Sequence, residues 1–111
     1  MNIGSIEVKG TGLTNGHPAV IISGKMAAGT VCAMNGLLSL DKTTGVFEAY
    51  DFDAPSGAAC IALDTIMEST TAARVLLHGT FDGVMAVKAD GASLNAVELA
   101  AVQANSQIYF V

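Results

Sequence analysis

The chain has 111 residues, enough for one domain that buries roughly two-thirds of the surface exposed by its unfolded form. Apolar residues make up 51% and charged residues 14%, which favours burial of apolar surface against other subunits or a larger partner. The net charge is −5 and the five Lys and Arg residues are dispersed, so the sequence argues against direct nucleic-acid binding.

The apolar runs are too short to cross a membrane, since a spanning helix needs about 20 consecutive apolar residues. The sequence therefore predicts no membrane partner. The first ten residues, MNIGSIEVKG, lack the basic start and apolar run of a secretory signal. We therefore expect the protein to be made in the cytoplasm and not to enter a membrane.

Residues 1–24 differ in pattern from the rest of the chain. SIEVK alternates polar and apolar residues, GTGLTNG is rich in glycine, and HPAVIIS is a second strand-like run. The glycines do not match a dinucleotide-binding loop, because His17 and Pro18 follow them rather than a helix start. This pattern predicts a flexible N-terminal arm over residues 1–24 and a compact β-rich domain over residues 25–111.

Strand patterns begin after Gly29. The run TVCAM, the pair Asn35-Gly36 and the run LLSL together predict a hairpin. Residues 41–45 predict the next turn, with Asp41 capping backbone amides and Gly45 in a left-handed conformation. Residues 46–50 and the segment AACIAL predict two further strands, and DTIMESTT predicts a loop with at most one helical turn.

The polar residues of the central region offer little chemistry. Asp51 and Asp53 resemble the start of a calcium loop, but Pro55 and the alanines that follow break that pattern. His78 has no catalytic or metal-binding motif around it. We therefore assign no catalytic, cofactor-binding or metal-binding residues.

The two cysteines, Cys32 and Cys60, each lie in an apolar strand-like run and form no C-x-x-C pair. Such residues are typical of buried reduced thiols. A disulfide between them stays open, because the sequence does not give their separation.

The C-terminal part predicts a strand, a helix and a last strand. In the strand ARVLLHGTF, we expect Leu76, Leu77 and Phe81 to serve the core or a trimer interface. Asn95 and Glu98 have the spacing of a helix capping box, Asn105 is the expected helix end, and QIYFV predicts a terminal strand. The residues with helical spacing along one face of this helix are Leu94, Val97, Ala101 and Ala104. These elements predict a mainly β (α+β) fold.

From about Gly24 onward, the order of these features resembles the lambda-type phage head decoration proteins, which stabilise the capsid. The resemblance rests on GKMAAGTVCA, on VFEAYD followed by GAACIAL, on RVLLHGTF, on the helix and on IYFV. The chain departs from the family in its longer NGLLSLDKTTG stretch, in Cys60 where members often carry Gly, and in VMAVK where some members place a Trp-Pro segment.

The resemblance implies a small β-barrel or β-tulip-like subunit with a structural rather than an enzymatic role. It implies a homotrimer that binds the major capsid protein on the outer surface of the expanded head, at threefold and quasi-threefold sites. Arms of this family add to strands of the capsid protein, a mode that needs strand-forming residues more than a side-chain code. The capsid-binding residues expected in this arm are Ile3, Ile6, Val8, Val20, Ile21 and Ile22.

Two other functions remain open on the sequence. The same composition permits an oligomeric β-domain adaptor of a phage tail or fibre. A small-molecule-binding or enzymatic β-barrel would have to use His78, Asp51, Asp53 and Cys60, which are its only candidate polar residues.

Overall fold

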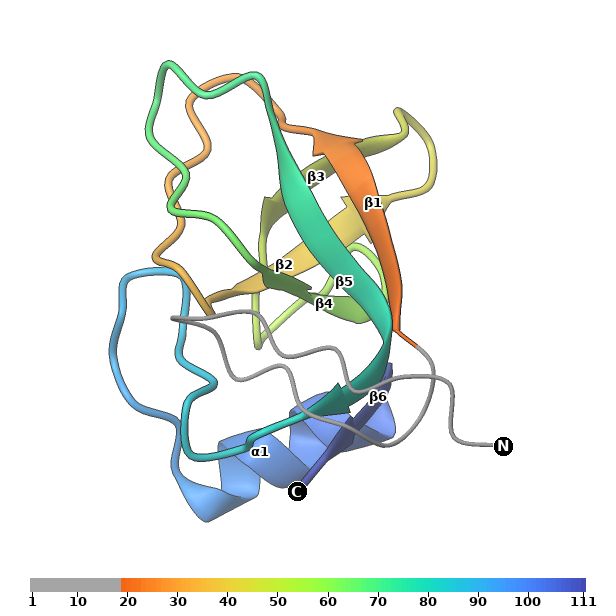
Figure 1. The fold of residues 1–111 in the computed structure, drawn as a ribbon, viewed down its shortest axis with the longest axis vertical. Helices are drawn as coiled ribbons and strands as arrows, with labels where there is room; N and C mark the ends of the chain where they lie inside the picture. Colours follow the sequence, from red (N-terminus) through yellow and green to blue (C-terminus); the bar gives the residue numbers. More distant parts are fainter. Residues whose placement is uncertain (1–18) are drawn as a thin grey trace.

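A six-stranded sheet with one helix against it forms the fold, as a computed structural model that describes residues 19–111 shows (Figure 1). The elements in chain order are β1 (Val20–Lys25), β2 (Leu37–Asp41), β3 (Val46–Ala49), β4 (Ala59–Ala62), β5 (Ala72–Phe81), α1 (Ala96–Ala104) and β6 (Gln107–Phe110). The expected mainly β fold, with its helix in the C-terminal half, is confirmed.

The sheet is a small barrel closed by one short seam. Its strand order is β1-β5-β4-β2-β3, with antiparallel neighbours throughout. At the end of β1, Met26 forms a bridge to Phe47 of β3, and the Ala27 N–H donates to the Phe47 carbonyl at 2.9 Å. Gly24 lies so close to the Phe47 ring that a Cβ there would come within 2.6 Å of a ring carbon. The first and last strands of the order therefore meet.

Strand β5 is the longest element and the one around which the others are arranged. β1 pairs with it on one side, from Val20 opposite His78 to Lys25 opposite Ala72. On its other side, β4 and then β6 follow one another, and the Ala59 N–H joins them by donating to the Asn105 carbonyl at 2.8 Å. β6 runs parallel to β5, and α1 provides the crossover that a parallel neighbour needs.

Alternating residues of these strands fill two separate cores, because successive side chains of a strand point to opposite faces. Leu37, Ile61 and Leu76 face α1 and belong to a helix-side core that also contains Val102 and Ile108. Their chain neighbours point into the barrel and form a barrel core, whose members include Leu38, Cys60, Val75, Phe47 and Cys32. One face of the sheet therefore lines the barrel core, and the other face packs against α1.

The hairpin between β2 and β3 has the turn that the sequence predicts. The Thr43 N–H donates to the Asp41 carboxylate at 2.9 Å, and Gly45 has a φ of 74°. The predicted hairpin at Asn35-Gly36 is wrong. Asn35 does turn the chain, with a φ of 67°, but Cys32 bridges to Ile66 and β2 pairs with β3 and β4. The turn therefore connects the loop at Cys32 to the sheet instead of joining two paired strands.

The expected boundary between arm and domain falls inside β1. Residues 20–24 pair with β5, since β-branched side chains at positions 20–22 match a strand position in the sheet. Residues 1–18, which carry most of the expected arm, lie outside the described residues.

The helix begins and ends where the sequence predicts, but it buries a different face. The Asn95 side chain accepts from the Glu98 N–H at 2.7 Å, the Glu98 carboxylate accepts from the Asn95 N–H at 3.1 Å, and Asn105 is the C-cap. The only fully buried residue of α1 is Val102, whereas Val97 is 79% exposed and Ala101 and Ala104 are also exposed. Of the expected apolar face, Val97, Ala101 and Ala104 therefore point to solvent, whereas Leu94, just before the helix, packs against the helix-side core.

Candidate interaction surface

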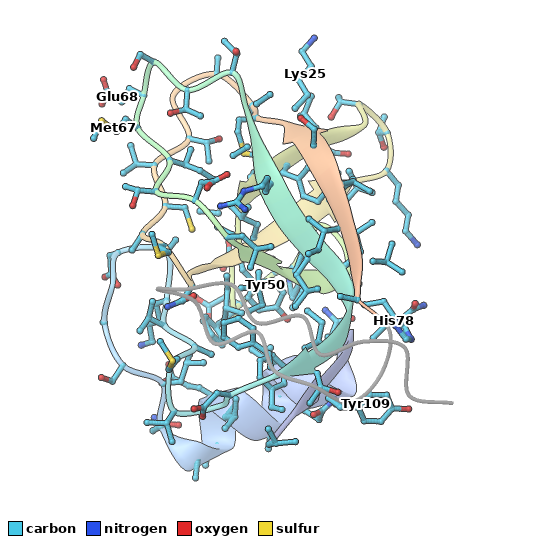
Figure 2. All side chains as sticks on the ribbon, in the orientation of Figure 1. Lys25, Tyr50, Met67, Glu68, His78 and Tyr109 are labelled. Carbon is cyan, nitrogen blue, oxygen red and sulfur yellow. The ribbon has the colours of Figure 1, made fainter. Side chains whose placement is uncertain are left out.

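The four candidate polar residues of the sequence do not form one site. Cys60 is buried in the barrel core, while Asp51 and Asp53 lie in an exposed loop where the Asp53 N–H donates to the Asp51 carboxylate at 2.9 Å. His78 lies half-buried on β5 (Figure 2). Within residues 19–111, no three His, Cys, Asp or Glu side chains are grouped as ligands for a metal ion.

Both cysteines are buried in the barrel core and no disulfide joins them. Burial raises the pKa of the Cys32 thiol and of the Cys60 thiol to about 12, because the apolar surroundings disfavour the thiolate. Since the thiolate is the reactive form of cysteine, burial disfavours the reactive form of both side chains in the folded protein.

The three residues expected in a core or trimer interface lie on β5. Leu76 and Phe81 are fully buried in the helix-side core, and the Phe81 ring meets Phe110 edge-on with ring centroids 6.3 Å apart. Leu77 is half-buried and packs against the barrel core. Leu76 and Phe81 could contact a second subunit only after a rearrangement of the fold. Leu77 has an exposed part that a second subunit could reach.

The expected capsid-binding residues divide into two groups. Ile3, Ile6 and Val8 lie outside the described residues, so their prediction stands as made. The other three lie on β1, where Val20 is 46% exposed, Ile22 is 38% exposed and Ile21 packs against the helix-side core. One face of β1 thus presents two β-branched side chains to solvent.

A second exposed apolar surface lies beside α1, and the sequence analysis does not locate it. We call it the α1 surface and define it by the groove residues Gly83, Val84, Leu94, Leu99 and Val111. The exposed Val97 of the helix, which does not line the groove, is counted with this surface. The groove has a volume of about 430 Å³, and no charged side chain lines it. Val84 at its rim is 91% exposed.

Local hydrogen bonds fix the turn that carries Val84. The Asp82 carboxylate accepts from the Val84 N–H at 2.9 Å, and the Asp82 carbonyl accepts from the Met85 N–H at 3.0 Å. The Gly83 N–H donates to the Val111 carbonyl at 2.9 Å, which joins the turn to the end of β6. Because these bonds hold the backbone on both sides of Val84, its side chain projects from a defined position.

An ion pair near the groove joins α1 to the segment that precedes it. The Lys88 ammonium lies 2.7 Å from the Glu98 carboxylate, so the capping residue of α1 is also tied to the segment that precedes the helix. The hydrogen bond from Lys88 holds the pKa of Glu98 below its usual value, and the same bond holds the pKa of Lys88 above its own. The charge of Glu98 is thereby paired within the subunit.

A third group of exposed apolar residues lies on the loops at the far end of the barrel. Val31 is 52% exposed and Met67 is 63% exposed. Figure 2 shows Met67 and Glu68 at the opposite end of the molecule from Tyr109, which lies beside α1. These side chains are also apolar and exposed but lie far from the α1 surface, so they are suitable control sites for substitutions.

Comparisons with known proteins give no further assignment. In the described part of the chain, no helix is both long and apolar enough to span a membrane. No protein-family model matches the sequence, and no curated protein is significantly similar to it.

Proposed function

We propose that this protein is a structural subunit of a phage head, a homotrimeric decoration protein that binds the outer surface of the expanded capsid and stabilises it. The proposal rests on the order of features in the sequence, which resembles the lambda-type decoration proteins. One observation supports it most: the segments that carry this resemblance occupy successive parts of a single fold. VFEAYD contains β3, GAACIAL contains β4, RVLLHGTF lies in β5 and IYFV contributes to β6.

The binding element in this proposal is the N-terminal segment together with the exposed face of β1. Residues 1–18 precede β1 directly, and the exposed Val20 and Ile22 extend the same strand-forming pattern into the sheet. Addition of such a segment to a strand of the major capsid protein would supply backbone hydrogen bonds without a specific side-chain code.

Multivalency supports a stabilising role without any chemistry. A trimer on a threefold site presents three arms, so the second and third attachments occur at a high effective concentration. A subunit that bridges neighbouring capsid proteins raises the free energy needed to separate them, which opposes the outward pressure of packaged DNA.

The direct test mixes the purified protein with expanded and unexpanded heads of the phage that encodes it. We expect the protein to sediment with expanded heads and to appear in cryo-microscopy maps at threefold and quasi-threefold positions. Failure to bind expanded heads would overturn the proposal, and labelled protein found on tails or fibres would favour the adaptor function instead.

A truncated variant tests the role of the arm. Deleting residues 1–16 removes Ile3, Ile6 and Val8 and leaves β1 complete. We expect an unchanged thermal transition and weaker sedimentation with expanded heads. Met67→Glu, at the far end of the barrel, is the matched control and should bind as the unmodified protein does.

A further inference from the structure

We propose that, in the free subunit, residues 5–9 pair with the outer edge of β1 and complete the barrel wall there. The pairing is antiparallel, with Val8 opposite Ile22 and Ile6 opposite Gly24. It goes beyond the proposed function, because it holds or fails whether or not the protein binds a capsid.

The outer edge of β1 is the edge that faces away from β5. Within the described part of the chain, only β5 forms a ladder with β1, and β3 meets it only at the seam beside Met26. The Met26 N–H donates toward β5, to the Thr71 carbonyl at 2.9 Å, whereas the Ala27 N–H donates toward β3. Since backbone groups of successive strand residues alternate between the two edges, those of Ser23 and Ile21 point away from β5. They offer a template for one more strand.

The barrel face of β1 is partly uncovered along this edge. Ile22 lies directly opposite Val75, a fully buried member of the barrel core, so the two side chains share one face of the sheet. Gly24 is on the same face, since a Cβ there would come within 3.1 Å of Val75. Ile22 is nevertheless 38% exposed, because β1 continues beyond its seam with β3 to a part where no described strand flanks it (Figure 1). A strand with apolar side chains on this face would cover it.

The segment directly before β1 has the sequence of such a strand. Residues 1–18 lie outside the described residues and end where β1 begins, so a hairpin is the shortest path by which they reach this edge. Residues 5–9, SIEVK, alternate polar and apolar side chains, and the pair Asn15-Gly16 between them and β1 is typical of a hairpin turn. The chain therefore supplies its own occupant for the edge.

The apolar pattern selects the register, since a shift of one residue turns every side chain to the other face. A three-residue loop over residues 14–16 places Val8 opposite Ile22, on the barrel face. The last position of such a loop is commonly left-handed, which the glycine there accepts. A two-residue loop over residues 15–16 would place Val8 opposite Ser23 instead, on the exposed face.

Charge favours the same register. Lys25 is exposed at the end of β1, on the face opposite to the barrel core, and Figure 2 shows its side chain projecting from the molecule. In the selected register Glu7 lies opposite Ser23 and diagonal to Lys25, a spacing that long side chains of opposite charge can bridge. Both charged residues of SIEVK then lie away from the barrel face.

The pairing is weak, because ordering five residues costs backbone entropy that offsets much of the gain from burying two apolar side chains. We expect the closed form to be favoured about tenfold at 25 °C, which lowers the apparent affinity for a capsid strand by about the same factor. On heating, the segment separates from β1 before the two cores unfold, so its removal leaves the thermal transition unchanged.

Amide hydrogen exchange, measured by NMR at 25 °C, tests the pairing in the full chain and in the variant that lacks residues 1–16. The Ser23 N–H points to the outer edge, so it should exchange about tenfold more slowly in the full chain. The Thr43 N–H, which donates to the Asp41 carboxylate in the distant β2–β3 turn, is the control and should exchange at the same rate in both proteins. Equal exchange of Ser23 in the two proteins would overturn the inference.

Two matched substitutions in the full chain test the register, and both leave the described residues unaltered. Val8→Glu places a charge against Ile22 and should remove the slow exchange of Ser23. Ser5→Glu places the same charge on the outer face beside Lys25 and should retain it. Slow exchange that both variants lose, or that both retain, would overturn the assigned register.

Protein concentration shows which chain supplies the strand. Ser23 exchange that does not depend on concentration supports pairing within one chain, whereas protection that grows with concentration would assign the strand to a second copy and overturn the inference. Sedimentation with expanded heads is a separate measurement. A protein with slow Ser23 exchange that does not bind expanded heads would support the inference and overturn the decoration role.

Discussion

Gln103 accepts a hydrogen bond from the backbone N–H of Phe110 at 2.9 Å, and its side-chain nitrogen donates to the Ile108 carbonyl. An adjacent strand would bond the same two groups, so this side-chain amide acts as a one-residue substitute for a neighbouring strand. Exposed strand edges are templates for unwanted pairing, and α1 covers this one with a single side chain.

Replacing this amide should destabilise the protein. Gln103→Ala leaves the Phe110 N–H without its partner and removes one of the two side-chain donors to the Ile108 carbonyl, the other being the Ser106 hydroxyl at 3.3 Å; we expect a loss of about 1–3 kcal/mol in the free energy of unfolding. Urea denaturation measures it. Gln107→Ala, on the exposed side of the same strand, is the control and should stay within about 0.5 kcal/mol of the unmodified protein. Equal stability of the two variants would contradict the role given to Gln103.

Phe81 is the second stability test. Its side chain is fully buried between the sheet and α1, in contact with the Phe110 ring. Phe81→Ala should cost about 3–5 kcal/mol, through lost burial and the cavity left behind. Val31→Ala, at a site that is 52% exposed, should change the thermal transition little. A Phe81→Ala variant that unfolds at the unmodified temperature would remove Phe81 from the core.

The ion pair between Asp64 and Arg74 predicts a pH dependence. Arg74 Nη2 lies 2.7 Å from the Asp64 carboxylate, and its side-chain hydrogen bonds hold the pKa of Asp64 below its usual value. A lowered carboxyl pKa stabilises the fold above the unfolded pKa of about 3.9, and this contribution is lost as pH falls through the lower folded value. Both side chains are more than a third exposed, so solvent screening limits the contribution to about 1 kcal/mol or less.

Asp64→Asn tests the predicted direction of this pH dependence of stability. At pH 7 the variant should unfold at a slightly lower temperature than the unmodified protein, and the difference should disappear as the pH falls through the lowered pKa of Asp64 in the folded protein, because the native carboxyl is then protonated too. Asp53→Asn makes the same chemical change in an exposed loop and serves as the control. A difference that grows toward low pH would contradict the assignment.

The buried thiols predict a large contrast in reactivity. Because burial raises the pKa of both thiols to about 12, the folded protein at pH 8 should react with DTNB much more slowly than the unfolded protein. In guanidinium the two cysteines should react together. Cys60→Ala isolates Cys32, and rapid reaction of either thiol in the folded protein would show that its site opens.

Where the residues that define a turn or a helix end are close together in the sequence, the sequence predicts that turn or helix end. Asn95 and Glu98 are three residues apart, and their reciprocal bonds locate the helix start without help from the rest of the chain. Asp41 and Gly45 identify the β2–β3 turn for the same reason. The turn at Asn35 has an equally clear signal, but its strand partners lie far along the chain, so the sequence predicts the bend and not the pairing.

The candidate surface is harder to predict from sequence. Small apolar residues occur all round α1, so spacing alone does not distinguish the buried Val102 from the exposed Val97. Gln103 has the pattern of a solvated helix residue, and only the position of β6 shows its role. The low charge content does indicate that the fold leaves apolar surface exposed, but the location of that surface depends on how the chain folds around β5.

The seam between β1 and β3 has a consequence for the order in which the fold opens. Every other pair of neighbouring strands shares a ladder, whereas this seam depends on the Ala27–Phe47 hydrogen bond, the Met26 bridge and the contact of Gly24 with the Phe47 ring. Separating β1 from β3 therefore breaks few backbone bonds, but it exposes Met26 and Phe47 at one side of the barrel core while the helix-side core stays packed. In native-state hydrogen exchange, the Ala27 amide should exchange through local opening, long before the amides of β4 and β5 that require global unfolding.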